Sequence, residues 1–451
     1  MKKRFTLLAL LLSGFLYQGV LAQSTPAHAL QNIVLHSADG TTTESATIVW
    51  RDGVVEAAGE NATIPFDAFV IDGGDSLHVY PGFIDGLAVW GSPDLPKDLK
   101  PLDEPGNPPF DRAGIQPERK PSELLTPDKA FEAGMKAGFT TAALGLKGFM
   151  LPGKVEVFYL SPDNTIDGLF KESLGLSGSF KEAPGGWSNG AYPSTMMGVM
   201  AKFRQVMFDA TALQQHINYY RENAEMPAPA RNQVLEAMFP LVNETTPFYF
   251  QVDSKEDIER LFVLQDQFGF DAVIVSGKGA HAKADDLKQR NIPVLASIDF
   301  TEAPKWYAKL KKEEDPEEEK EEEEKEDPEE NEELTEEEQA YRERQLEAWK
   351  EEVTNIKKLK EAGVNVGYAS AGMDLKDLSK KLEILLDEGG LTEEEVVELM
   401  TTNTAQIIGV ENSFGNIATG KNASFSVFDK PVSDKKAKVL QSISNGTIYE
   451  F

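Results

Sequence analysis

The chain has 451 residues, with 45 Lys or Arg against 75 Asp or Glu and a formal net charge of −30. Such an acidic balance argues against nucleic acid or an anionic membrane surface as a partner. The sequence contains no cysteine, which excludes disulfides, thiol nucleophiles and thiolate-bound zinc, and it contains only five histidines.

The first residues form a segment typical of an export signal. Residues 2–4 are all basic, and an apolar run over residues 5–17 follows them. This run is too short to span a membrane. Residues 20–22, Val-Leu-Ala, suit a signal peptidase, so we expect residues 1–22 to be a signal peptide cut before Gln23. The sequence therefore predicts a periplasmic or secreted protein with no membrane anchor.

Two β-hairpins are predicted at opposite ends of the chain. Near the N-terminus, Asp52-Gly53 separates the strand-like residues 46–50 and 54–58. Near the C-terminus, Asn445-Gly446 separates residues 439–444 from 447–449, after a further strand at 423–428. We expect residues 30–80 and 410–451 to build one small β-sandwich domain from both chain ends.

Between the two ends, short apolar runs alternate with helical stretches. Residues 271–275 and 292–296 read as buried strands, and residues 257–267 and 282–288 as helices. Such alternation is typical of βα units and a parallel sheet. Residues 81–405 are numerous enough for a (β/α)8 TIM barrel with insertions, so we expect an α/β fold of that kind.

One segment carries more than half of the net charge. Residues 313–338 hold 19 acidic residues and two lysines. We interpret this stretch as a solvated acidic insertion within the barrel. A docking tail for a basic partner and a weak calcium-binding segment are the functional alternatives, although no EF-hand spacing is present.

Several motifs, in order along the chain, carry a family resemblance. They are Tyr80-Pro81-Gly82-Phe83-Ile84-Asp85, Gly138-Phe139-Thr140-Thr141, Thr401-Thr402-Asn403-Thr404-Ala405, and the stretch from Gly415 to Ala423. Together they resemble the metal-dependent amidohydrolase superfamily, and within it the imidazolonepropionase-like group. The resemblance implies the same barrel and two-ended β domain. Residues 154–190 and the acidic insertion resemble no part of the family.

The resemblance also implies where metal ligands would stand, and these positions hold other residues. The family uses zinc or another divalent metal to activate a water molecule. Its ligands would be a His-x-His pair at Leu87 and Val89, histidines at Gln251 and about Ser276, and an aspartate at Ala371. Leu, Val and Ala offer no lone pair, and Gln and Ser are poor zinc ligands. We therefore expect no bound metal, no cofactor and no catalytic residue.

The five histidines provide no evident replacement site. They stand at positions 28, 36, 78, 216 and 281, and no two are spaced i, i+2 or i, i+4. The family's Asp85 is present and is expected to support the turn after the first barrel strand.

Three hypotheses about function follow. The first is a degenerate pseudo-enzyme that acts as a scaffold or partner, and the resemblance implies an active amidohydrolase subunit or fused domain as that partner. The second is an active hydrolase of C–N bonds, in cyclic amides or dipeptide-like substrates, with an unconventional site. The third is a ligand- or cation-binding module.

Overall fold

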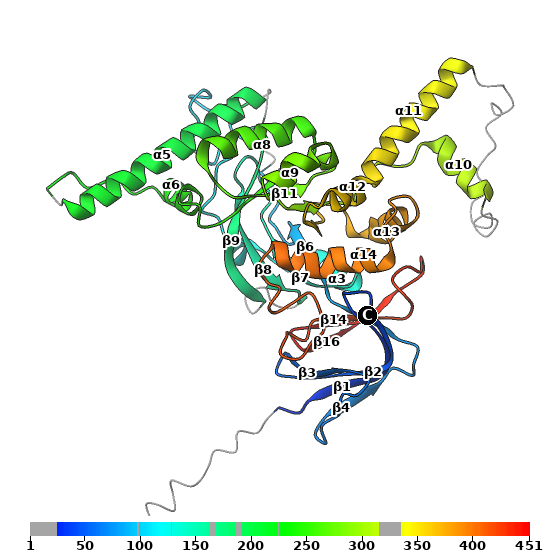
Figure 1. The fold of residues 1–451 in the computed structure, drawn as a ribbon. Coiled ribbons are helices and arrows are strands. Elements are labelled where there is room, and N and C mark those ends of the chain that lie inside the picture. Colours follow the sequence, from blue (N-terminus) through cyan, green and yellow to red (C-terminus); the bar gives the residue numbers. More distant parts are fainter. Residues whose placement is uncertain are drawn as a thin grey trace, which may run out of the picture.

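The computed structural model describes residues 25–96, 99–127, 129–162, 168–185, 191–223, 225–314 and 335–451. The predicted signal peptide, residues 1–22, and most of the predicted acidic insertion, residues 313–338, lie outside these ranges. The described chain forms two eight-stranded sheets, one in a β domain built from both chain ends and one in a helix-covered barrel (Figure 1). The predicted fold class is thus confirmed.

The β domain is one continuous sheet in the order β16-β15-β14-β5-β1-β2-β3, with β4 also paired to β1. Its strands are β1 (His28–His36), β2 (Thr42–Arg51), β3 (Val54–Gly59), β4 (Phe69–Asp72), β5 (His78–Pro81), β14 (Phe425–Phe428), β15 (Val439–Ser444) and β16 (Thr447–Glu450). Strand β5 joins the two ends of the chain, because it pairs with β1 in parallel and with β14 antiparallel. Apolar side chains from both ends share one buried cluster.

Both predicted hairpins are present, and their turns contact each other. Asp52-Gly53 and Asn445-Gly446 all have positive φ, as a two-residue hairpin turn requires. The indole Nε1 of Trp50 donates a hydrogen bond to the carbonyl of Gly446 at 3.0 Å. The Trp50 side chain thus ties the first hairpin directly to the last one.

The barrel sheet has the order β6-β7-β8-β9-β10-β11-β12-β13. Its strands are β6 (Phe83–Ala88), β7 (Phe139–Leu144), β8 (Gly153–Tyr159), β9 (Leu169–Ser179), β10 (Phe248–Val252), β11 (Ala272–Ser276), β12 (Val294–Ala296) and β13 (Val366–Tyr368). Seven of these strands run in one direction. Strand β8 runs in the other, antiparallel to both β7 and β9, so an antiparallel meander stands where the sequence predicted βα units.

The first and last barrel strands are joined by backbone and side-chain bonds. The N–H of Ala371 donates to the carbonyl of Leu87 at 3.1 Å. The fully buried carboxyl group of Asp85 accepts from the N–H of Leu87 at 3.0 Å and from the N–H of Ser370 at 3.1 Å. Asp85 therefore supports the turn as expected, and it also closes the barrel.

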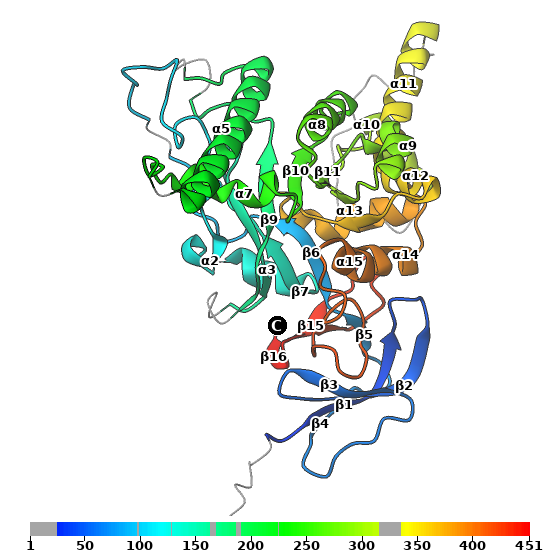
Figure 2. The same cartoon turned by 60° about the vertical axis from the view of Figure 1, so that its left-hand side comes forward.

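Helices surround the barrel sheet (Figure 2). They are α2 (Pro121–Leu124), α3 (Lys129–Lys136), α5 (Met196–Glu222), α6 (Gln233–Ala237), α7 (Phe239–Val242), α8 (Lys255–Phe268), α9 (Ala284–Gln289), α10 (Lys305–Glu314), α11 (Glu336–Val353), α12 (Asn355–Ala362), α13 (Leu378–Asp387), α14 (Glu393–Glu398) and α15 (Thr404–Ile407). Short turns are the 3-10 segments η1 (Ala280–Lys283) and η2 (Leu375–Asp377) and the π-helical η3 (Leu399–Asn403). Helices α5 and α11 extend at the end of the molecule away from the β domain.

Helix starts follow ordinary capping chemistry. Thr392 with Glu395 forms a capping box at the start of α14, and Thr335 with Glu338 forms a second one at the start of α11. No helix in the described part of the chain combines the length and apolarity needed to cross a bilayer.

Candidate functional site

A cavity of about 340 Å³ lies at the carboxyl ends of the barrel strands. Leu87 at the end of β6, Val89 just after it, Gln251 on β10 and Ala371 after β13 all line this cavity. Four of the five positions that the sequence comparison picked out are therefore brought together by the fold. In TIM barrels this end of the strands is where functional sites form.

Ser276 is the position that does not line the cavity. It is the last residue of β11, it is 3% exposed, and it has a positive φ of 75°. Its carbonyl accepts a hydrogen bond from the N–H of Ser297 at 2.9 Å, which links it to the end of β12. Ser276 thus stands beside the site but not in it.

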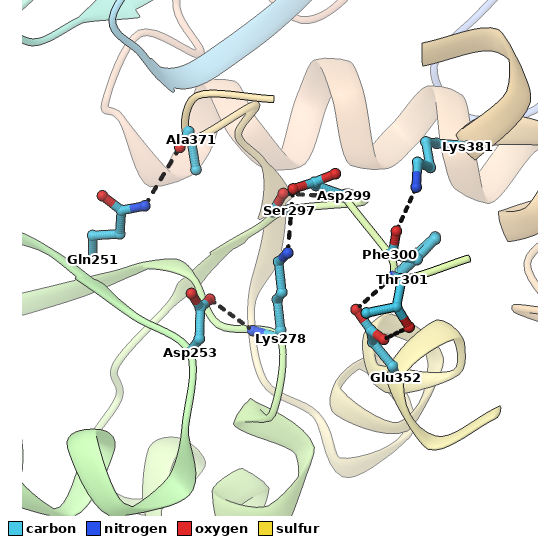
Figure 3. A network of polar contacts seen from close by, with 10 residues as sticks. All are labelled: Gln251, Asp253, Lys278, Ser297, Asp299, Phe300, Thr301, Glu352, Ala371 and Lys381. Atoms are coloured by element: carbon cyan, nitrogen blue, oxygen red, sulfur yellow. Dashed lines mark hydrogen bonds and ion pairs between the residues drawn. The ribbon is translucent and has the colours of Figure 1, made fainter. Parts of the chain in front are cut away.

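Gln251 and Ala371 contact each other across the cavity. The amide Nε2 of Gln251 donates to the carbonyl of Ala371 at 3.4 Å (Figure 3). The Gln251 amide therefore binds a backbone group on the opposite wall. This contact links the end of β10 to the loop after β13.

These residues do not fit a zinc ion or another divalent cation. Leu87, Val89 and Ala371 present only carbon from their side chains, and Gln251 presents one neutral amide. Divalent zinc needs three or four nitrogen, sulfur or carboxylate donors. Throughout the ranges that the structure describes, no cluster of three or more His, Cys, Asp or Glu could hold a metal ion.

The cavity has a cationic side that the sequence analysis missed. Lys147 and Lys181 line it, each two or three residues past a strand end. The Lys147 N–H donates to the Ser92 hydroxyl at 2.8 Å, and an Arg119 guanidinium reaches the Lys147 carbonyl at 3.4 Å. The backbone that carries Lys147 is therefore held in place. Counting onward from the strand motif at Gly138-Phe139-Thr140-Thr141 would have located Lys147, but Lys181 follows β9, which the sequence did not predict.

A polar network beside the cavity was also missed. Lys278 follows β11, and its Nζ pairs with the Asp299 carboxylate at 3.3 Å, while its N–H donates to Asp253 at 3.4 Å (Figure 3). The N–H of Asp299 in turn donates to the Ser297 hydroxyl at 3.2 Å. All four residues lie at or just after the carboxyl ends of barrel strands. The network contains one lysine and two carboxylates, so the Lys278 ammonium pairs with Asp299 and Asp253 is held by a backbone N–H alone.

The histidines are placed away from the cavity. His281 donates from its N–H and from Nδ1 to the Asn355 amide oxygen, at 2.9 and 3.0 Å. His216 contacts the carbonyl of Pro227 at 3.1 Å, and His28 stacks on Trp50. These three contacts are structural, and they tie loops and strands together.

The sequence spacing did not predict that two histidines meet. His36 on β1 and His78 on β5 share a hydrogen bond of 2.8 Å between Nε2 and Nδ1. His36 also stacks on Tyr80, whose hydroxyl donates to Glu393 of α14 at 2.6 Å. The pair therefore lies where the β domain contacts the barrel.

This histidine pair is expected to make stability fall at acidic pH. Burial, and then the neighbouring His78, lowers the pKa of His36, and burial lowers that of His78, although Glu393, Glu394 and Asp429 favour the charged forms. A depressed folded-state pKa means that the fold prefers neutral rings, so stability present above pH 6.5 is lost as pH falls. Between pH 7.5 and pH 5, the free energy of unfolding measured in urea should fall less steeply for His78→Asn than for the parent chain.

The matched control for this experiment is His216→Asn, because His216 is half-buried on α5 and lies away from the interface between the β domain and the barrel. It should keep the parent's pH dependence. If His78→Asn lost stability with falling pH as steeply as the parent, the loss could not be assigned to the histidine pair.

Comparisons with known proteins agree on the fold. The model of the amidohydrolase family matches residues 295–449. An amidohydrolase from Thermotoga maritima MSB8 superposes with a TM-score of 0.73 at 19% identity, over 94% of this chain and 100% of that one. A Xaa-Pro dipeptidase with bound methionine gives 0.50 at 15% identity, over 94% and 100%. A search of curated proteins finds no match. At these identities the likeness concerns the fold.

Proposed function

We propose that the chain is a member of the metal-dependent amidohydrolase superfamily that has lost the metal chemistry and acts as a scaffold or partner of an active amidohydrolase. The family match over residues 295–449 and the barrel architecture support its place in the superfamily. One observation carries the rest of the proposal. Leu87, Val89 and Ala371, none with a ligating side chain, line the same cavity at the strand ends.

The chemistry of the cavity supports this reading. Metal-assisted hydrolysis requires a cation that lowers the pKa of a bound water and polarises the scissile carbonyl. The described lining of the cavity contains no histidine, aspartate or glutamate that could bind such a cation or act as a general base. We therefore expect neither hydrolysis nor a bound cofactor at this cavity.

The experiment is a metal analysis of the mature chain from Gln23, purified without a histidine tag. We expect less than about 0.1 equivalent of zinc, manganese or iron by plasma mass spectrometry, unchanged after soaking in each metal, because the donors do not suffice. An active amidohydrolase treated in parallel serves as the positive control. Amide and dipeptide substrates should show no turnover.

Two results would contradict the proposal. One is a metal content near one equivalent. The other is turnover that a chelator abolishes, which would favour an active hydrolase with an unconventional site.

A further inference from the structure

We propose that the barrel-mouth cavity is a binding site for a small amphipathic monocarboxylate, with the carboxylate held by Lys147 and Lys181. The inference rests on the proposed loss of metal chemistry, because a bound divalent cation would otherwise dominate the field in this cavity. The inference names the ligand that this cavity binds when no metal ion is present.

The charge of the lining is the first argument. About one residue in six of this chain is acidic, since 75 of 451 are Asp or Glu. The described residues that line the cavity include two lysines and no acidic residue. A cationic lining in such an acidic protein selects anionic ligands, since the rest of the surface repels them.

The state of the two lysines is the second argument. Lys147 pairs with Asp94 at 3.3 Å, but Lys147 is 42% exposed and Asp94 is 82% exposed. Exposed ion pairs contribute little stability, so a ligand carboxylate can replace Asp94 at small cost. Lys181 lies on the exposed rim of the cavity, two residues beyond the end of β9.

The walls of the cavity define the other half of the ligand. Leu87, Val89, Leu146 and Phe149 give it an apolar face. The Gln251 amide nitrogen uses one proton on the Ala371 carbonyl and carries a second that this contact does not use. About 340 Å³ accommodates an aromatic or branched aliphatic body of small size.

The reversed strand β8 explains why the cationic side is close to this face. Because β8 runs antiparallel to β7, the connection between them, residues 145–152, returns at the mouth and supplies Lys147 to the wall. The end of β9 lies beside it and supplies Lys181.

The test compares 3-phenylpropanoate with its neutral amide, 3-phenylpropanamide, by isothermal titration calorimetry on the full mature chain. We expect saturable binding of the carboxylate, at least tenfold weaker binding of the amide, and weaker carboxylate binding as salt is raised. The double variant Lys147→Met/Lys181→Met should lose at least tenfold in affinity.

The matched control is Lys136→Met/Lys376→Met, which removes two positive charges from exposed lysines that do not line the cavity. It should bind within twofold of the parent. Equal affinity for the amide, unchanged affinity in the Lys147/Lys181 variant, or no saturable binding of the carboxylate would each overturn the inference.

The same samples separate this inference from the proposed function. Conversion of 3-phenylpropanamide to the acid, followed by NMR, would overturn the loss of hydrolytic chemistry but would leave a carboxylate site in place. Absence of carboxylate binding without any turnover would overturn the carboxylate site alone.

Discussion

Replacement of Asp85 by alanine is expected to lower the free energy of unfolding by about 2–4 kcal/mol at pH 5, because two buried N–H groups lose their acceptor. These are the N–H groups of Leu87 and Ser370, on the first barrel strand and just after the last one. The carboxyl group is completely buried, so water cannot replace it unless the first and last barrel strands separate. Urea unfolding followed by tryptophan fluorescence and circular dichroism measures the change.

Asparagine at the same position provides the matched variant. Both N–H groups contact Oδ1, and the Ser370 N–H also contacts Oδ2 at 3.2 Å, so an asparagine whose carbonyl takes the place of Oδ1 can accept both of them. Burial raises the pKa of Asp85 to about 7, so the native state prefers the neutral carboxyl. The parent chain should lose stability from Asp85 as pH rises from about 4 to 7, and Asp85→Asn should not lose it.

The difference between the parent and Asp85→Asn is therefore the decisive quantity. The free energy of unfolding of Asp85→Asn minus that of the parent should increase as pH rises. Between about pH 4 and pH 7 its slope should correspond to about one proton. A difference that stays flat with pH would contradict the raised pKa. An alanine variant as stable as the parent would contradict the role of Asp85 in closing the barrel.

Replacement of Gly86 by alanine is expected to lower the free energy of unfolding by about 1–3 kcal/mol or more, because the added methyl group has no room between the first and last barrel strands. A Cβ at this position would lie 2.7 Å from the backbone carbonyl oxygen of Tyr368 and 2.5 Å from a methyl carbon of Leu295. A carbonyl of the adjoining strand cannot move without disturbing the pairing between β12 and β13. Thermal and urea unfolding both report the loss.

The control is the same substitution at a glycine with space around it. A Cβ at Gly106 would meet no atom within 4 Å, so Gly106→Ala should be neutral or slightly stabilising. If Gly86→Ala proved as stable as Gly106→Ala, the first and last barrel strands would have to be less tightly joined than described.

The elements that sequence predicted well are those with strong local chemistry. The turns at Asp52-Gly53 and Asn445-Gly446 depend on neighbouring residues alone. The meander of β8 and β9 was not predicted, because these strands lie almost entirely in residues 154–190, which resemble no part of the family. Strand β9 contains glycine and serine in place of a continuous apolar run, and its two partners are chosen by tertiary pairing.

The site was predictable only in part, and for a similar reason. Leu87, Val89, Gln251 and Ala371 could be located because each follows a recognisable strand motif, and the fold places them around one cavity. Lys147, Lys181 and Lys278 carry no motif of their own, since a lysine after a strand is most often a solvated residue. Their significance depends on which strand ends become neighbours, and β8 changed that arrangement.

The contact between the two ends of the chain also determines the order in which this protein can fold. Strands β1, β2 and β3 can form a local meander early, but the outer edge of β5 has no partner until residues 425–428 arrive. Until that moment the backbone of β5 is an open sheet edge, and open edges recruit other strands. During synthesis, more than three hundred residues separate β5 from β14, so the β domain stays incomplete until β14 to β16 have been made.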